Sequence, residues 1–552
     1  MQIIAESNEV AAAAKFKTCG VMIDCSRNAV LRPETFRDIL LIMSRMGMNT
    51  AMLYTEDTYE IEGYPYFGYM RGAYTKSELR DLDACASSLG IELIPCIQTL
   101  GHLVTALRWP YAENIKDRPD ILLADEPETY KFIDAMLKSC RECFSTAKIH
   151  IGMDEAHDVG LGKHLDRHGF QNRFDILSRH LAKVAEMAAG YGFEPMMWGD
   201  MFFRLGSKTG DYYDTDVVIP KDLPGKIPRN VSLVYWDYYN EDFGTYLTLA
   251  QKHLEMGRGV IFAGGIWKWA GMGINYGKTF RATVPALNAC RAAGIAGVFA
   301  AMWGDDGAEV NIYAALPGMQ LFAEYARSGE VSEERLRERF RICTGYDMET
   351  FLLLDIDDYP PRWCHSGEAL AVSKQVLYQD VLLGLFDKNF EGIDLAGHYR
   401  KKLEALKKAG VPGGLEKLFD YHKQLLLVLA RKCDIGIRIT GAYKRHDLPA
   451  LAALIKELEI LHKDTEALHR KFRVLWLSTH KPFGLERADL RFGGVLARIK
   501  VAIERLSGYA EGRLDEIAEL EAPRLMYGGD DVQPGRSLVD CHLYSAIAVP
   551  AV

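Results

Sequence analysis

Short apolar stretches alternate with longer amphipathic segments through the first part of the chain, and this alternation predicts strands and helices in turn. The predicted strands are 19–26, 49–56, 91–98, 148–155, 194–201, 231–239, 259–266 and 296–304. Pro33 opens the first predicted helix. Its apolar face comprises Phe36, Ile39, Leu40, Met43 and Met46. Thr75 and Glu78 form a predicted capping box at the start of the second helix, which Gly90 ends. Later helices are predicted at about 128–143, 173–189, 243–256 and 281–293.

These strands are apolar almost throughout, which predicts parallel pairing with helices covering the sheet. Eight such units are the number that closes a (β/α)8 TIM barrel. An open doubly wound sheet is the alternative, but no glycine-rich phosphate turn follows the first strand. We therefore expect an α/β protein with a closed barrel.

After about Gly345 the pattern becomes almost entirely helical. We expect four parts, namely an N-terminal extension (1–18), a catalytic barrel (19–345), a linker (346–370) and an α-helical C-terminal domain (371–552). Two predicted helical faces carry Leu451, Leu454, Ile455, Leu458 and Leu461, and Val495, Ile499, Ala502, Ile503 and Leu506. Between them, 479–494 is predicted as a loop that braces the barrel mouth, forms a subunit contact or only connects.

Composition narrows the class of protein. The 552 residues include 66 basic and 75 acidic side chains, giving a net charge of -9, and no Lys/Arg stripe would follow a phosphate backbone, so nucleic acid is not an expected partner. The 11 cysteines lack framework spacing, which favours buried thiols in a reducing compartment. Residues 1–16 lack the features of a signal peptide, and no apolar stretch has membrane-span length, so we expect a cytoplasmic protein. Helical C-terminal domains commonly form dimers, so the sequence allows a homodimer.

The strongest chemical signal is KIHIGMDE at 148–155, which predicts a short buried strand ending on Asp154 and Glu155. Adjacent buried carboxylates raise each other's pKa, so such a pair indicates protonation chemistry or metal binding. Other polar and aromatic residues also fall at the predicted carboxyl ends of strands, where a barrel forms its active site. They are Asp24, Arg27, Asp57, His102, Trp198, Asp200, Trp236, Asp237, Trp267, Trp303 and Asp305.

Several tryptophans around an acidic mouth favour walls for a sugar ring, although each alone could be core bulk. A glycosidase needs a proton donor at the leaving oxygen and a nucleophile or charge at the anomeric carbon. Neighbouring residues of a strand point in different directions, so Glu155 could protonate the leaving oxygen while Asp154 serves elsewhere. Substrate assistance fits this pair. In it the sugar's 2-acetamido oxygen attacks the anomeric carbon, and Asp154 orients the acetamido N–H and stabilises the oxazolinium.

HIGMDE closely resembles the H-x-G-x-D-E signature of glycoside hydrolase family 20, the exo-acting β-N-acetylhexosaminidases, and the likeness spans about residues 19–310. It implies release of terminal β-linked N-acetylglucosamine or N-acetylgalactosamine. By the resemblance, Arg27 binds sugar hydroxyls, Asp57 steadies a histidine relay, and His102 and His150 match the family's histidines. The implied aromatic walls and distal-hydroxyl acid are Trp198, Trp236, Trp303 and Asp305, and Trp267 is a further candidate wall from its place at a predicted strand end.

The sequence departs from the family pattern in two places. YTED stands at 54–57 where the family usually has two histidines around a tryptophan, which weakens the assignment of Asp57. No clear motif fixes the tyrosine that donates to the acetamido oxygen; Tyr238 is the choice, with Tyr239 and Tyr276 close behind. The helical domain after the barrel is similar to a compact bacterial-type branch without the N-terminal α/β domain.

Two other interpretations stay open. His150, Asp154, His157 and Asp158 could be ligands of a metallohydrolase, but such sites usually take ligands from several strands, so no metal or cofactor is expected. A catalytically silent carbohydrate-binding barrel would keep the tryptophans but has no use for a protonatable acid beside Asp154.

Overall fold

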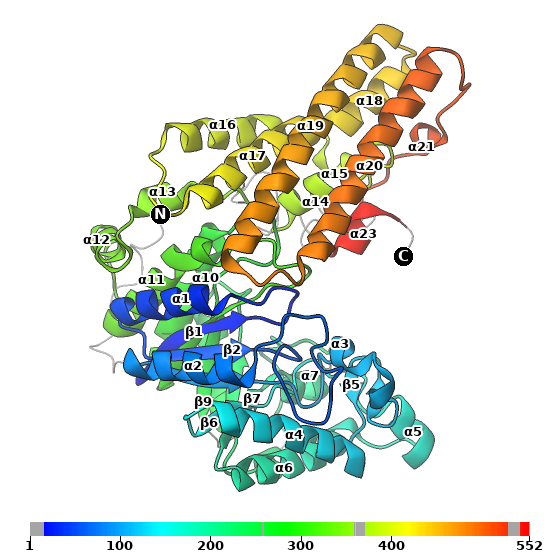
Figure 1. Cartoon of the computed structure of the whole chain (residues 1–552). Coiled ribbons are helices and arrows are strands. Elements are labelled where there is room, and N and C mark those ends of the chain that lie inside the picture. The colour runs from blue at the N-terminus through cyan, green and yellow to red at the C-terminus, as the bar shows by residue number, and fades with distance from the viewer. Residues whose placement is uncertain are drawn as a thin grey trace. The chain divides into compact units, whose positions relative to one another are not determined.

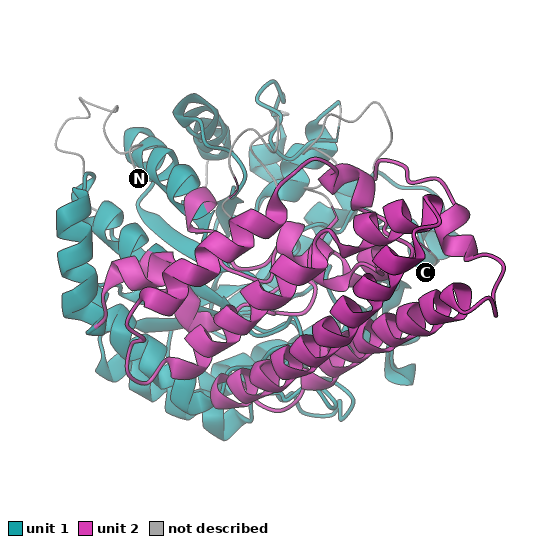
Figure 2. Ribbon diagram, turned by 90° about the horizontal axis from the view of Figure 1, so that it is seen from above, with its two compact units in different colours: residues 1–266, 279–303, 318–345 teal, residues 267–278, 304–317, 346–552 magenta. Residues whose placement is uncertain are grey.

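The computed structural model describes residues 16–208, 210–219, 221–256, 259–357, 359, 370–527 and 541–550. The chain forms two compact units (Figure 2). Unit 1 comprises Met1–Ile266, Thr279–Trp303 and Gly318–Gly345, and unit 2 comprises Trp267–Lys278, Gly304–Pro317 and Tyr346–Val552. Two segments that the sequence pattern places in the barrel domain therefore group with the C-terminal helices. Most of the predicted N-terminal extension (1–15) and much of the later part of the predicted linker (358 and 360–369) lie outside the described residues.

Unit 1 contains a closed barrel of eight parallel strands, which confirms the predicted fold class. The strand order is β1-β10-β9-β8-β7-β6-β3-β2, and β1 pairs with both β10 and β2 to close the barrel. The strands are β1 (Thr18–Asp24), β2 (Thr50–Tyr54), β3 (Glu92–Cys96), β6 (Lys148–His150), β7 (Glu194–Trp198), β8 (Ser232–Trp236), β9 (Val260–Gly265) and β10 (Gly297–Met302). Each lies within a predicted strand or one residue beyond it.

Helices surround these strands, as the lower part of Figure 1 shows. The main ones are α1 (Pro33–Met46), α2 (Lys76–Ser88), α4 (Pro127–Cys143), α6 (Arg173–Gly190), α9 (Phe243–Glu255), α10 (Tyr276–Ala293), α11 (Leu316–Ser328) and α12 (Glu333–Thr344). The predicted apolar face of α1 is buried, and the capping box of Thr75 and Glu78 is present at the start of α2. The buried face of α1 and the capping box of α2 therefore agree with the sequence pattern that predicts them.

The structure corrects the predicted strand at 148–155, because β6 ends at His150. Gly152, Met153 and Glu155 have φ angles of 72°, 71° and 49°. These left-handed conformations cannot continue a strand. The two acids consequently lie on a tight loop, and the period-two argument for their directions does not apply.

The connection from β3 to α4 contains elements that the sequence did not predict. They are α3 (Val104–Leu107), η2 (Pro110–Ala112), and the antiparallel pair β4 (Lys116–Arg118) and β5 (Ile121–Leu122). Three shorter helices lie between the barrel elements. Helix α5 (Lys163–His168) lies between β6 and α6, α7 (Asp200–Gly206) follows β7, and α8 (Leu223–Lys226) lies in the segment before β8.

Unit 2 is built mainly from helices. They include η3 (Ile312–Ala315), α13 (Met348–Leu352), α14 (Val372–Tyr378), α15 (Asp387–Phe390), α16 (Leu395–Lys408), α17 (Glu416–Lys432), α18 (Ile435–Lys444), α19 (Leu448–Thr479), α20 (Leu485–Ala510), α21 (Ala518–Glu521) and α23 (Tyr544–Ala548). In the part of the chain that the structure describes, no helix is long and apolar enough to cross a membrane.

The structure also corrects the predicted loop at 479–494. Helix α19 extends to Thr479 and α20 starts at Leu485, so most of this segment is helical. Gly484, with φ 94°, makes the turn between the two helices. Gly493 and Gly494 lie inside α20, and at Gly494 the Tyr544 hydroxyl approaches closely enough to crowd any β-carbon. Here glycine marks close packing and not a loop.

Candidate active site

The two acids stand on a loop that buried side chains hold in place. The backbone N–H of Gly152 donates to Nδ1 of His150 at 3.1 Å, and the N–H of Met153 donates to Oε1 of Gln98 at 3.1 Å. His150 is fully buried, and burial lowers its pKa to about 3. Its imidazole is therefore neutral and serves as an acceptor for the loop.

Asp154 is a buried carboxylate with two close donors. Gln98 Nε2 donates to Oδ1 at 2.7 Å, and His102 Nε2 lies 3.1 Å from Oδ2. Burial raises the pKa of Asp154, but the charge of His102 and the hydrogen bonds of His102 and Gln98 outweigh it, so the pKa lies below its usual value. Asp154 is consequently ionised at neutral pH.

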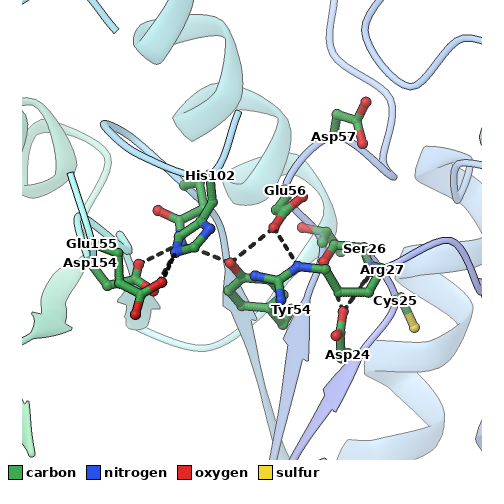
Figure 3. Close-up of polar contacts among 12 residues, drawn as sticks. Asp24, Cys25, Ser26, Arg27, Tyr54, Glu56, Asp57, His102, Asp154 and Glu155 are labelled. Carbon is green, nitrogen blue, oxygen red and sulfur yellow. Dashed lines mark hydrogen bonds and ion pairs between the residues drawn. The ribbon is translucent and has the colours of Figure 1, made fainter. Parts of the chain in front are cut away.

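Glu155 shares His102 with Asp154 but is much more exposed. Its Oε2 atom lies 3.5 Å from His102 Nε2, and 39% of its side chain is accessible (Figure 3). Burial lowers the pKa of His102, yet the neighbouring Asp154 more than compensates and raises it to about 9. One imidazolium thus faces a buried, ionised acid and an accessible one.

A third acid, Asp200, supports this loop from α7. Its Oδ2 atom accepts the backbone N–H of Glu155 at 3.0 Å. Burial, followed by the charge of Asp154, raises the pKa of Asp200 well above the usual range of a carboxyl. The sequence predicts that Asp154 and Glu155 raise each other's pKa, and for Asp154 this is wrong, because His102 and Gln98 stabilise its charge.

Arg27 reaches the same region through Glu56. Arg27 Nε donates to Glu56 Oε1 at 3.1 Å, and the Tyr54 hydroxyl donates to the same oxygen at 3.2 Å (Figure 3). The guanidinium lies over the rings of Tyr54 and Trp303, at 5.8 and 5.5 Å from their centroids. Burial raises the pKa of Glu56.

Three of the predicted tryptophans line unit 1 near these polar groups. Trp198 packs against His150, with centroids 4.5 Å apart, and against Trp303 at 6.0 Å. Trp236 stacks on Tyr238 at 5.3 Å. Nε1 of Trp198 and Nε2 of His150 are buried and have no hydrogen-bond partner within the described residues.

Comparison with known proteins agrees with this geometry. The model described as "Glycosyl hydrolase family 20, catalytic domain" matches residues 16–223, and "Glycoside Hydrolase 20C C-terminal domain" matches residues 349–539. The chain belongs to glycoside hydrolase family 20. The resemblance drawn from the HIGMDE motif is thereby confirmed.

Relatives in this family are distant. Hexosaminidase D of Bos taurus is 26% identical over 255 residues, which are 44% of this chain and 69% of that protein. Hexosaminidase D of Homo sapiens is 25% identical over 245 residues, which are 42% of this chain and 48% of that protein. A solved family 20 structure, an exo β-N-acetylglucosaminidase from Vibrio harveyi with N-acetylglucosamine, is 17% identical with a TM-score of 0.45, covering 62% of this chain and 58% of that one. Likeness at that level bears no argument about the site.

The family resemblance predicts that Asp57 steadies a histidine, but in the structure its carboxylate pairs with an arginine. Asp57 Oδ1 pairs with Arg71 Nε at 3.2 Å (Figure 3 draws Asp57 apart from His102). Of the two acids of YTED, it is Glu56, one residue earlier, whose charge acts on His102, where it adds to the larger effect of Asp154. Glu56 has φ 46°, and this left-handed residue directs the two acids of YTED to different partners.

The three candidate tyrosines for the acetamido group, and Trp267 and Asp305, differ in burial and in the unit to which they belong. Tyr238 is buried and Tyr239 is 39% exposed. Tyr276 belongs to unit 2, where its hydroxyl donates to the Ala314 carbonyl at 2.6 Å, so that proton is already used. Trp267 and Asp305 also belong to unit 2, and Trp267 stacks on Trp269 with centroids 4.2 Å apart.

The residues considered as metal ligands do not form a metal site among the residues that the structure describes. His157 Nε2 lies 2.6 Å from the Tyr212 hydroxyl, and Asp158 lies 3.5 Å from Arg118. Among the residues that the structure describes, no group of three or more His, Cys, Asp or Glu side chains could hold a metal ion.

Proposed function

We propose that this protein is an exo-acting β-N-acetylhexosaminidase that releases terminal β-linked N-acetylglucosamine or N-acetylgalactosamine with retention of configuration. The observation that carries the proposal is the pairing at His102 of a buried, ionised Asp154 with an accessible Glu155. Two neighbouring acids in unlike environments suit two different roles.

In the first step the acetamido oxygen of the substrate attacks its own anomeric carbon, and the bond to the leaving oxygen breaks. Glu155 gives its proton to that oxygen. Asp154 accepts the acetamido N–H and balances the positive charge of the oxazolinium, where a fixed buried carboxylate acts most strongly. In the second step Glu155 takes a proton from water, which opens the oxazolinium and restores the β configuration.

The other residues bind the sugar. Trp198, Trp236 and Trp303 provide apolar walls, and Arg27 binds ring hydroxyls from its fixed position on Glu56. His102 and His150 hold the two acids and their loop. Tyr238 is the proposed donor to the acetamido oxygen, with Tyr239 as the alternative. Trp267 and Asp305 keep only the roles predicted from the sequence, and Asp57 pairs with Arg71.

A panel of paired 4-nitrophenyl β-glycosides tests the proposal. We expect turnover of the N-acetylgluco or N-acetylgalacto substrate, and at least about 100-fold slower turnover of the matching glucoside and galactoside, because only the first pair carries the nucleophile. Equal turnover with and without the N-acetyl group would refute substrate assistance. A silent binding barrel would release no chromophore, and a metallohydrolase would lose activity after dialysis against a chelator.

A thiazoline analogue of the oxazoline provides a second, independent measurement. Because it resembles the intermediate, it should inhibit at concentrations at least about 100-fold below the substrate KM. Inhibition only near the KM would favour a nucleophile supplied by the protein.

A further inference from the structure

Asp200 is a buried carboxyl that the proposed mechanism does not use. It is the first residue of α7, directly after the turn that follows β7, and only 6% of it is exposed. Its Oδ2 atom accepts the backbone N–H of Glu155. Glu155 has φ 49°, a conformation that costs a non-glycine residue about 1–2 kcal/mol and persists only where surrounding contacts hold it. The hydrogen bond from Asp200 is such a contact.

The same carboxyl also reaches the aromatic wall. The side chain of Trp236, at the end of β8, acts on the same carboxyl, and its polar interaction lowers the pKa of Asp200 in part against burial. Trp236 stacks on Tyr238 with an interplanar angle of 21°. Asp200 therefore connects the backbone of the proposed proton donor to the wall that carries the proposed acetamido donor.

The groups around Asp200 supply no compensating cation. Asp154 and Glu155 face it from the loop after β6, and Tyr212 faces it from the loop after α7. On α7 itself, Arg204 turns to the Tyr212 ring and the Gly210 carbonyl. His150 beside Trp198, and His253 beside Gly199, are both buried with lowered pKa values and are neutral. Within the described residues, no Lys or Arg pairs with Asp200.

We propose that Asp200 is a positioning residue that works as a neutral carboxyl, holding the backbone of Glu155 and the indole of Trp236 in register for the reaction. This inference rests on the proposed function. Oδ1 of Asp200 is buried and accepts no hydrogen bond from the described part of the chain, so the acid can carry its proton on Oδ1 while Oδ2 accepts the Glu155 N–H. A buried acid next to an ionised one is most stable when it keeps its proton.

Ionisation of Asp200 would change this balance. A carboxylate accepts stronger hydrogen bonds than a neutral acid, by a factor of about two. Ionisation would also place a second buried charge beside Asp154, and an uncompensated buried charge costs several kcal/mol. The cost of the buried charge is larger than the gain from a stronger hydrogen bond. An ionised Asp200 therefore turns away or admits water, and either change breaks its hydrogen bond with the backbone N–H of Glu155.

The pH dependence of kcat separates a neutral Asp200 from a charged one. Asp200→Asn keeps the acceptor and the neutral charge, whereas Asp200→Ala removes both. With 4-nitrophenyl N-acetyl-β-glucosaminide, we expect the wild-type kcat to fall on the alkaline side of neutrality. Asp200→Asn should lower kcat about two- to fivefold at pH 6 and move the alkaline limb up by about one pH unit or more, because the group that ionises is gone. Asp200→Ala should lower kcat about 100-fold and change KM far less.

Asp83→Asn is the matched control, since Asp83 is also a buried carboxyl that accepts a backbone N–H, from Ser145 at 3.1 Å. Its pH profile should coincide with that of the wild type. The inference is wrong if the alkaline limbs of Asp200→Asn and the wild type coincide, or if Asp200→Asn loses as much activity as Asp200→Ala, since the charge would then be what matters.

Tryptophan fluorescence gives a readout that needs no turnover. The wild type should show an alkaline transition as Asp200 ionises beside the Trp236 indole, and Asp200→Asn should lack it. A wild type that hydrolyses no N-acetyl substrate at any pH refutes the proposed function, whereas identical fluorescence titrations of the two proteins refute the role of Asp200. The two failures are therefore distinguishable even if Asp200→Ala does not fold.

Discussion

At the scale of single residues, the site assigns unlike environments to two acids that are adjacent in sequence. Asp154 is buried, yet two donors keep it ionised. Glu155 is accessible, and only the tip of its side chain approaches His102. A pair of acids whose environments differ in this way can divide the charge-stabilising and proton-donating roles between them.

Glu155→Gln should affect turnover according to the leaving group. General acid catalysis contributes about 10²–10⁴-fold for a poor leaving group and little for an activated one. We expect kcat/KM for a disaccharide to fall at least about 100-fold more than kcat/KM for a dinitrophenyl glycoside. Asp154→Asn is the comparison variant and should lower both by a similar factor, because orienting the acetamido group is needed for either substrate. Equal losses for Glu155→Gln on both substrates would contradict its role as the acid.

The sequence predicts some of these residues and not others. Arg27, His102, Asp154 and Glu155 are predicted because they stand in motifs at strand ends, and their placement follows from the barrel. Tyr54, Gln98 and Glu56 are missed, although each is in or just after a predicted strand. Glu56, which Tyr54 binds, and Met153, which donates to Gln98, have positive φ, and a pattern of apolar and polar positions does not encode those angles.

At the scale of single elements, the acid loop depends on Gly152. Its φ of 72° suits glycine, and a β-carbon there would collide with the Gln98 side chain. Gln98 donates to Asp154 and to the Tyr54 hydroxyl, so moving it would disturb both. The loop can turn tightly beneath the two acids only because position 152 carries no side chain.

Gly152→Ala should therefore lower both stability and activity. The left-handed conformation costs about 1–2 kcal/mol, and overpacking against Gln98 adds about 1–3 kcal/mol. Gly90→Ala is a close control, because Gly90 also has φ 72° but a β-carbon added there would meet no atom within 4 Å. We expect the melting temperature of Gly152→Ala to fall below that of Gly90→Ala, and kcat to fall only in Gly152→Ala. Equal effects of the two variants would show that backbone strain alone matters.

Helices and strands are predictable from the sequence where apolar periodicity is strong. They are less predictable where a glycine conformation or a short strand pair sets their boundaries. The sequence predicts all eight barrel strands, and α1 buries the predicted face. The predicted strand at 148–155 is too long, because Ile151 and Met153 are buried like strand residues although they lie on a loop. The pattern does not predict the start of α20 at Leu485, because Gly493 and Gly494 indicate a loop.

At the scale of the whole molecule, unit 2 has a buried ionic cluster of its own, defined here as Lys374, Arg491, Asp306 and Glu309. Arg491 lies 2.7 Å from Asp306 and 2.6 Å from Glu309, and Lys374 lies 3.4 and 3.3 Å from the same two acids. Asp306 and Glu309 come from the segment after β10, whereas Lys374 is on α14 and Arg491 on α20. The cluster joins segments far apart in sequence, and the half-exposed Arg487 also pairs with Asp306, at 2.8 Å.

Arg491→Met tests how strongly this cluster stabilises unit 2. Arg491 is 3% exposed, and removing one partner of a buried ion pair costs about 3–5 kcal/mol because the other charge is left uncompensated. Lys374 remains beside both acids, so we expect the lower end, about 3 kcal/mol. Calorimetry should show the transition of unit 2 lowered by about 6–12 °C, at about 2–4 °C per kcal/mol for a unit of this size.

The exposed pair of Arg438 and Glu457 provides the control, since its side chains are 40% and 42% accessible. Such surface pairs contribute about 0–1 kcal/mol, so Arg438→Met should change the same transition by about 4 °C or less. Adding Glu309→Gln to Arg491→Met removes the uncompensated charge and should restore part of the loss, which a double-mutant cycle measures directly. If Arg491→Met and Arg438→Met unfold at the same temperature, apolar packing and not the ionic cluster holds the segment after β10 to the helices of unit 2.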